Sequence, residues 1–345
     1  MKTTKLISLA LAAILMATSL LLTSCSTAPN IPIVCGETGM NDTMGVATYG
    51  VDYYSLGVKA GDMAADILIN SASPATMAVA TDPNPALSVN EKVASEIGFT
   101  IPDSIKSRAT GGDTKKVTRD ASAIVDSGAD YTVGILQLVQ HVALDQSNEG
   151  FCDQLSVRMA AAGKKVTILN ENASGDEANN ATIVNTLIGK SVDLIYTIAT
   201  SSSQAAVAAT KENKIPVVFN AVTDPVGAGL VASMDAPGAN VTGVSDINPV
   251  EKQIELITEL KGSTDIKIGF LYTSAETNSV TQINMAKAYC KEKGIAYVER
   301  GIADITEVNT AMVALANEGV DAIYIPTDNV LANGAATVHA INVGE

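Results

Sequence analysis

Near the end of the chain the sequence reads Val320-Asp321-Ala322-Ile323-Tyr324-Ile325, then Pro326-Thr327-Asp328-Asn329, then a helical stretch at 330–343. This is a strand, a turn and a helix, and a parallel α/β sheet is expected to continue with one more apolar strand. The stretch Ile31-Pro32-Ile33-Val34-Cys35-Gly36 is such a strand, and it has no partner in its own part of the sequence. Placing it beside 320–325 restores the alternation and predicts a circularly permuted, two-lobed protein. Permutation is tolerated where the original termini lie close together at the surface.

The remaining sequence contains two series of alternating strands and helices. The first series has strands at 133–139, 166–169, 193–198, 215–219 and 241–244, with helices at 148–162, 176–187 and 204–212. The second has strands at 267–272, 296–299 and 320–325, with helices at 250–260, 278–293 and 307–317. Lys214-Ile215-Pro216-Val217-Val218 in the first series resembles Asn30-Ile31-Pro32-Ile33-Val34, which assigns residues 30–52 to the second lobe. The pattern predicts a two-lobed α/β fold with parallel sheets, right-handed crossovers and helices on both faces.

The start of the chain has the composition of an export leader. Lys2 and Lys5 precede an apolar stretch at 6–22, which is short for a membrane span. Leu22-Thr23-Ser24-Cys25 resembles a bacterial lipobox, which implies cleavage before Cys25 and lipid on its sulfur. An uncleaved anchor and an ordinary signal peptide are the alternatives. Two or more acyl chains anchor a protein firmly, so the predicted location is the extracytoplasmic face of the cell membrane.

These features predict the following organisation. It comprises a signal peptide at 1–24, a lipidated tether at 25–29, the C-terminal half of lobe B at 30–52, a return helix with hinge and closing segment at 53–110, a permutation linker at 111–130, lobe A at 131–246 and the N-terminal half of lobe B at 247–345.

Composition excludes several classes of protein. A hydrophobic content of 47% excludes general disorder. A net charge of −15 argues against nucleic-acid binding, because phosphates require a basic surface. Besides Cys25, three cysteines remain, Cys35, Cys152 and Cys290, without CxxC spacing; buried free thiols are expected, and one disulfide stays an alternative.

Catalytic and cofactor motifs are incomplete. Gly189-Lys190-Ser191 lacks the earlier glycine of a P-loop, where Val184 stands instead. The loose GxGxxA at 227–232 lies well past a strand end and not in a tight strand–helix turn, so no dinucleotide site is expected. His141 and His339 fall in different lobes, and a zinc site needs several convergent ligands. The sequence therefore predicts a binding protein that uses no cofactor or metal, and not an enzyme.

Small polar residues follow the strands whose carboxyl ends should face a cleft. Thr200-Ser201-Ser202 starts a helix, where N–H groups and hydroxyls suit a carboxylate, although one serine is also expected to cap the helix. Thr223-Asp224 follows the next strand and offers a hydroxyl to a ligand, with a turn alone as the alternative. Asp328-Asn329 occupies the equivalent place in lobe B, where an acid could hold an ammonium or simply cap a helix. Glu37 and Asp52 are the alternative ammonium ligands.

Several segments resemble a known family. They are 133–141 with Leu144-Asp145, 220–229, 238–245, 326–329 and 49–57, and they resemble the ABC-transporter substrate-binding lipoproteins of the tryptophan/tyrosine-uptake type. The resemblance covers nearly all of the mature chain in permuted order, since family members usually begin near Tyr131 and end near Ala109. It implies a periplasmic-binding-protein type I fold, with two Rossmann-like lobes joined by crossover strands, that closes on an amino acid. By this analogy the carboxylate would bind Thr200, Ser201 and Thr223, the ammonium would bind Asp328 with Asp52 or Glu37, and the side-chain pocket would comprise Gln140, His141, Leu144 and Tyr272.

The sequence thus predicts a monomeric, lipid-anchored solute-binding protein that delivers an amino acid, of the aromatic class, to an ABC permease. A ligand-sensing receptor lobe of the same fold and a binder of another small solute are the alternatives. An engineered or misassembled gene order is the alternative to natural permutation.

Overall fold

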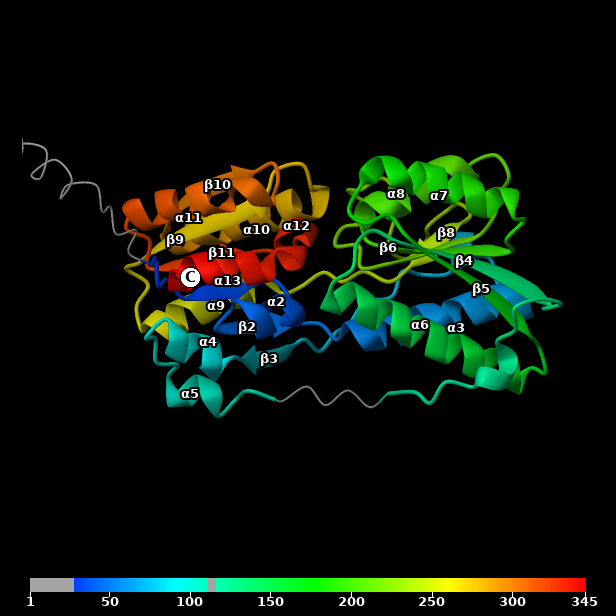
Figure 1. Cartoon of the computed structure of the whole chain (residues 1–345), viewed down its shortest axis with the longest axis horizontal. Coiled ribbons are helices and arrows are strands. Elements are labelled where there is room, and N and C mark those ends of the chain that lie inside the picture. The colour runs from blue at the N-terminus through cyan, green and yellow to red at the C-terminus, as the bar shows by residue number, and fades with distance from the viewer. Residues whose placement is uncertain (1–27, 111–115) are drawn as a thin grey trace, which may run out of the picture.

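The structure is a computed structural model that describes residues 28–110 and 116–345. The predicted leader, Cys25 and residues 111–115 of the predicted linker lie outside the described residues. The described chain forms two α/β lobes that lie side by side and are joined by extended segments (Figure 1).

Lobe A is built on a five-stranded sheet in the order β5-β4-β6-β7-β8, with every pair parallel. Its strands are β4 (Tyr131–Gln137), β5 (Val166–Asn172), β6 (Leu194–Ile198), β7 (Val217–Asn220) and β8 (Val241–Gly243). One apolar core lies between the sheet and helices α3 (Tyr53–Asn70) and α6 (Val142–Ala161). The opposite face is covered by α7 (Glu177–Gly189) and α8 (Thr200–Thr210) (Figure 1).

Helices α3 and α6 pack closely because glycines replace side chains at their contact. A Cβ on Gly57 would lie 2.2 Å from the Ser147 carbonyl oxygen, and one on Gly150 would lie 2.2 Å from the Tyr54 carbonyl oxygen. Either methyl would force the backbones apart. This contact fixes α3 to lobe A, although the sequence around α3 belongs to lobe B.

Lobe B has a six-stranded sheet in the order β10-β9-β11-β1-β2-β3. Its strands are β1 (Ile33–Cys35), β2 (Ala47–Gly50), β3 (Ala86–Val89), β9 (Lys267–Thr273), β10 (Ala296–Ile302) and β11 (Ala322–Ile325). One face is covered by α4 (Glu91–Glu96), α5 (Asp103–Lys106), α9 (Val250–Lys261) and α10 (Thr277–Lys293). The other is covered by α2 (Thr38–Thr43), α11 (Val308–Asn317), α12 (Asn329–Asn333) and α13 (Ala335–Val343).

The position of β1 confirms the prediction that the two ends of the chain share one sheet. β1 is parallel to β11, with Ile33 opposite Ile323 and Cys35 opposite Ile325. It lies between β11 and β2, as β7 lies between β6 and β8 in lobe A. The similarity between 30–34 and 214–218 therefore reflects equivalent positions in the two lobes.

One strand departs from the predicted parallel order. β3 is antiparallel to β2, with Ala47 opposite Val89 and Gly50 opposite Ala86. The chain leaves β2 towards lobe A, forms α3 there, and returns through residues 77–85. Because it enters the sheet from the interlobe side, β3 must run opposite to β2.

Several boundaries also differ from the predictions. α6 begins at Val142 and α8 at Thr200, about one to two turns earlier than expected. The C-terminal helical stretch is divided at Gly334 into α12 and α13. The short helix α2 was not predicted; six residues give too little periodicity to detect.

The second half of the predicted linker is folded against lobe A. It contains the 3-10 helix η2 (Ala121–Ala123), whose Ala123 is fully buried. Val125 N donates to Val166 O at 3.1 Å, and Thr167 Oγ1 donates to Val125 O at 2.8 Å, which adds an edge contact beside β5. The polar composition concealed this packing because only a few small residues of the segment are buried. The remaining short 3-10 helices are η1 (Pro74–Thr76) and η3 (Ile305–Glu307).

Three described segments cross between the lobes, at 51–52, 81–85 and 245–249. Asn248 links two of them to lobe B, since its Oδ1 accepts from Val51 N at 3.1 Å and its Nδ2 donates to Thr327 Oγ1 at 3.1 Å. Ser245 N donates to Ala80 O at 2.8 Å. These contacts hold the crossing segments together as one hinge.

Cys35, Cys152 and Cys290 are buried free thiols in β1, α6 and α10, as expected. No helix within 28–110 and 116–345 is long and apolar enough to cross a membrane. The same residues contain no cluster of metal-ligating side chains.

Candidate functional site

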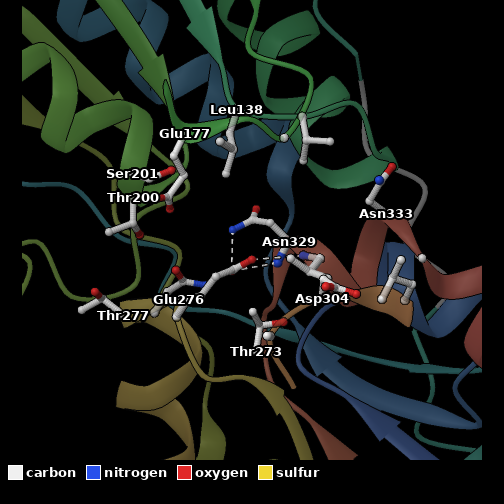
Figure 2. Close-up of a pocket in the computed structure, with 18 of the residues that line it drawn as sticks. Leu138, Glu177, Thr200, Ser201, Thr273, Glu276, Thr277, Asp304, Asn329 and Asn333 are labelled. Atoms are coloured by element: carbon white, nitrogen blue, oxygen red, sulfur yellow. Dashed lines mark hydrogen bonds between the residues drawn. The ribbon is translucent and has the colours of Figure 1, made fainter. Parts of the chain in front are cut away.

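A cavity of about 380 Å³ lies between the lobes. Lobe A contributes the starts of α7 and α8, and lobe B contributes the starts of α10 and α12 together with η3. Figure 2 shows Glu177, Thr200 and Ser201 on one side of the cavity and Thr273, Glu276 and Thr277 on the other. Helix N-termini thus converge on the cavity from both lobes, as expected where the carboxyl ends of strands meet.

The start of α8 combines an unusual backbone with an uncapped helix end. Ala199 has φ 89° and ψ 160°, a region that is essentially restricted to glycine and often marks functional sites. No side chain caps the helix, so the prediction that one of the serines does so is wrong. The Ser201 hydroxyl oxygen is buried and has no hydrogen-bond partner among the described residues. This helix end can therefore accept an anionic group.

The neighbouring serines turn away from the cavity. Ser202 Oγ donates to Asn180 Oδ1 at 2.9 Å, and Ser203 Oγ donates to Ala199 O at 2.7 Å. Of the predicted Thr200-Ser201-Ser202 set, Thr200 and Ser201 line the cavity and Ser202 can offer only its backbone N–H.

Asp328 has a structural role that conflicts with the predicted ammonium contact. Its carboxylate accepts from Thr273 N at 2.6 Å, Thr273 Oγ1 at 2.9 Å, Ser279 Oγ at 2.8 Å and Leu331 N at 2.9 Å. These four donors occupy the lone pairs of both oxygens. Asp328 therefore caps α12 and ties it to β9, and the alternative of a helix cap is the correct one.

Glu276, which was not among the predicted site residues, lines the cavity beside Asn329. Asn329 donates to its Oε2 from the backbone at 3.0 Å and from the side chain at 2.8 Å. Burial, and secondly the charge of Asp328, raise the pKa of Glu276 to about 7. The strand-end rule applied to β9 would have identified this residue, because Glu276 follows that strand by three positions.

The floor of the cleft is a compact polar cluster around Asp246. Tyr53 Oη donates to Asp246 Oδ2 at 2.7 Å, and Thr223 Oγ1 donates to Asp246 Oδ1 at 3.2 Å. Burial raises the pKa of Asp246. A space of only about 10 Å³ remains here, bordered also by Leu144, so the predicted Thr223 and Leu144 lie at the floor of the cleft and not in its open part.

A second interlobe cavity, of about 200 Å³, adjoins the floor and contains Gln140, His141 and Glu37. His141 Nε2 lies 3.5 Å from Asn329 Oδ1 across the lobes, and burial lowers the pKa of His141 to about 4. The carboxylate of Glu37 caps α2 by accepting from Gly39 N and Met40 N, and burial raises its pKa to about 7. These predicted residues therefore border the closed floor from the other side.

Three predicted residues lie elsewhere. Asp224 Oδ1 accepts from Gly227 N at 2.8 Å and so forms a turn. Asp52 caps α3 by accepting from Tyr54 N and Ser55 N. Tyr272 is partly buried against the core of lobe B and is not among the described residues that line the interlobe cavities.

The cleft is therefore electrostatically asymmetric. In lobe A the uncapped, positive start of α8 lies on the same side of the cavity as Glu177, whereas in lobe B the acids Glu276, Asp304 and Asp328 lie at the facing helix starts. Such a cleft can hold a zwitterion with its carboxylate towards lobe A and its ammonium towards lobe B.

Comparison with known proteins places the chain in a family. The family described as ABC transporter substrate binding protein matches residues 7–112 and 132–344. A tyrosine-binding protein of Clostridioides difficile is 38% identical over 216 residues, which cover 63% of this chain. The chain spans 61% of the length of that curated relative.

Two solved structures are similar. A conserved domain protein from Vibrio cholerae has a TM-score of 0.56 and 36% identity, with 62% of this chain and 71% of that chain covered. An ABC domain from Streptococcus pneumonia in complex with L-Trp has a TM-score of 0.53 and 37% identity, with the same coverage. Proteins of the matched family bind substrates outside the cytoplasm for membrane transporters and are not enzymes. The chain belongs to the family of ABC transporter substrate-binding proteins.

Proposed function

We propose that the protein binds an amino acid, preferably an aromatic one, in the interlobe cleft and delivers it to an ABC permease. The observation that carries this proposal is the polarity of the cleft, with the uncapped start of α8 opposite the acidic helix starts of lobe B. Similarity to a tyrosine-binding protein and to a domain in complex with L-Trp supports the aromatic class.

We propose a role for each end of the ligand. The carboxylate is placed at the backbone of Thr200 to Ser202, with hydroxyls from Thr200 and Ser201. The ammonium is placed at Glu276, because the carboxylate of Asp328 is already occupied. The apolar residues Leu138, Val139, Ile305 and Val330 also line the cavity and would contact the side chain.

Closure follows from the hinge. The three crossing segments would bend while the lobes remain rigid, so that the donors of α8 and the acids of lobe B reach the ligand together. Exclusion of water strengthens these charge-assisted contacts, and no covalent bond changes. We also propose that Cys25 carries lipid and that the protein is a monomer. Thr223 and Leu144, at the floor of the cleft, are proposed to contact the ligand as well.

Circular permutation is proposed for the chain order. It is supported by the pairing of β1 with β11 and by the short contacts that join Asn30 and Ile31 to Asn342. In this arrangement residues 30–52 complete lobe B, and the segment near 111–115 joins ends that other family members leave open.

The proposed function is tested by titrating the purified protein with each of the twenty amino acids in a calorimeter. Because the chain contains no tryptophan, added L-tryptophan can also be followed by its own fluorescence. Saturable binding of an aromatic amino acid, with weaker binding of alanine, is the expected result. Equal or undetectable binding of all twenty would overturn the proposal.

A further inference from the structure

The charges that line the 380 Å³ cavity are of one sign. Glu177 in lobe A and Glu276 and Asp304 in lobe B all border it. Among the described residues that line the cavity, none is lysine, arginine or histidine. A cationic ligand group in this cavity therefore lies near several carboxylates, whereas an anionic ligand group finds no cationic side chain among the described lining residues.

The anion-accepting end offers only neutral donors. These are the N–H groups at the start of α8 and the hydroxyls of Thr200 and Ser201. Glu177 lies on the same side of the cavity as these two residues (Figure 2) and would repel an approaching anion. The gain from binding a carboxylate here is correspondingly small.

The cation-accepting end is a buried carboxylate with an acceptor position still available. Glu276 Oε2 accepts from Asn278 and twice from Asn329, whereas, within the described part of the chain, Oε1 accepts only from Val330 N, at 3.1 Å. A carboxylate oxygen has two lone pairs, so Oε1 can accept one more donor. Hydrogen bonds between charged partners are about twice as strong as neutral ones, and burial reduces screening.

We propose that the ligand's ammonium group alone is sufficient for recognition, so that the cleft also takes arylalkylamines that lack a carboxylate, such as tryptamine. The inference rests on the proposed function in that it concerns the same cleft, and it goes further by naming a second ligand class. The matching aryl carboxylic acids, which lack the ammonium, are excluded.

If the ammonium group binds Glu276, the affinity for amines should depend on pH, which gives a second and independent test. Its neighbours are Asp328 behind it, Asp304 at the same side, Glu177 across the cavity, and His141 beyond Asn329. In the empty protein Glu276 has a pKa of about 7, and a bound ammonium would lower that pKa. Amine binding then releases a proton, and affinity is expected to rise about tenfold from pH 6 to pH 8.

The test compares L-tryptophan, tryptamine and indole-3-propionate by calorimetry on the full mature protein at pH 6 and pH 8. Tryptamine is expected to bind within about tenfold of L-tryptophan, and indole-3-propionate at least about a hundredfold more weakly. Glu276→Gln should weaken tryptamine about tenfold or more and abolish the pH dependence, whereas Glu292→Gln, on the exposed part of α10, should change neither. Glu177→Gln is a second variant on an exposed residue, and it should weaken tryptamine even if Glu276→Gln fails to fold.

The outcomes separate this inference from the proposed function. Binding of L-tryptophan without tryptamine, or tryptamine affinity that is independent of pH, would overturn the inference and leave the amino-acid function intact. Binding of tryptamine without L-tryptophan would support the inference and overturn the amino-acid function. Failure of all three ligands to bind would overturn both.

Discussion

Asn342, in the last turn of α13, holds the backbone of Ile31 at both of its polar groups. Asn342 Oδ1 accepts from Ile31 N at 3.1 Å, and Asn342 Nδ2 donates to Ile31 O at 2.9 Å. Asn30 N also donates to the Asn342 carbonyl oxygen at 2.9 Å. A single buried side chain thus joins the last helix to the segment that enters β1.

Asn342→Ala is expected to lower the free energy of unfolding by about 2 kcal/mol. The substitution leaves the N–H and C=O of Ile31 buried without partners, and unsatisfied groups of this kind are costly. Urea denaturation monitored by circular dichroism measures the effect. Thr337→Ala, on the exposed side of the same helix, is the control and should change stability little. Equal stability of the two variants would show that Asn342 does not hold the junction.

The double variant Thr200→Ala, Ser201→Ala is expected to weaken amino-acid binding several-fold and by at most about tenfold, because the two hydroxyls supply only part of a carboxylate contact that Glu177 opposes. The backbone N–H groups at the start of α8 remain, so binding should be reduced and not abolished. Calorimetric titration with L-tryptophan measures the loss. Ser233→Ala, in an exposed loop of lobe A, is the control. Unchanged affinity would place the carboxylate elsewhere.

Asp328→Asn is expected to reduce stability more than ligand affinity. An amide retains one acceptor oxygen but directs its NH₂ group at donors such as Thr273 N, so several buried hydrogen bonds are lost. A loss of about 2–4 kcal/mol in the free energy of unfolding is expected. Thermal and urea unfolding measure stability, and calorimetry measures affinity. A variant of normal stability that no longer binds would restore the ammonium role of Asp328.

Glu37 makes the stability of the protein depend on pH. Burial raises its folded-state pKa from 4.5 to about 7, so the folded protein binds more protons than the unfolded chain between these values. Stability is therefore full below about pH 4.5 and falls as the pH rises through about 7. Glu37→Gln should flatten this decline between pH 5 and pH 8, as measured by thermal unfolding. An identical decline in wild type and variant would assign it to another group.

Much of the fold could be predicted from periodicity alone. The apolar strands 133–139, 267–272 and 320–325 correctly predicted two parallel sheets. The resemblance of 30–34 to 214–218 correctly placed β1 in the sheet of lobe B. The orientation of β3 could not be predicted in this way, because it depends on α3 being held by lobe A through glycine contacts distant in sequence.

The candidate site was predictable in position but less so in detail. The rule that ligands bind at strand carboxyl ends correctly brought Thr200, Ser201 and Asn329 to the interlobe cavity. It could not show that Asp328 is saturated by donors from β9 and α10, since those contacts arise only on folding. For the same reason the burial of Glu276 and its raised pKa were not visible in the sequence.

Reversing the proposed permutation should leave folding and binding intact. The rearranged chain would begin at residue 116, continue to Glu345, pass through a short Gly-Ser linker to Asn30, and end at residue 110. It keeps η2 against lobe A and every contact of β1 with β11, so only the connectivity changes. Its affinity for L-tryptophan should lie within about twofold of the wild-type value.

The control is a second rearranged chain whose new ends lie between β6 and α8. This strand–helix connection carries Thr200 and Ser201, which line the cavity. This chain keeps the same residues, but Ala199 and the first turn of α8 are no longer held by a covalent connection to β6. It is expected to lose binding while the chain cut at 110–116 retains it. If both rearranged chains lost binding, the present order would be essential to the site, and the two lobes could not be regarded as a permuted form of the ordinary arrangement.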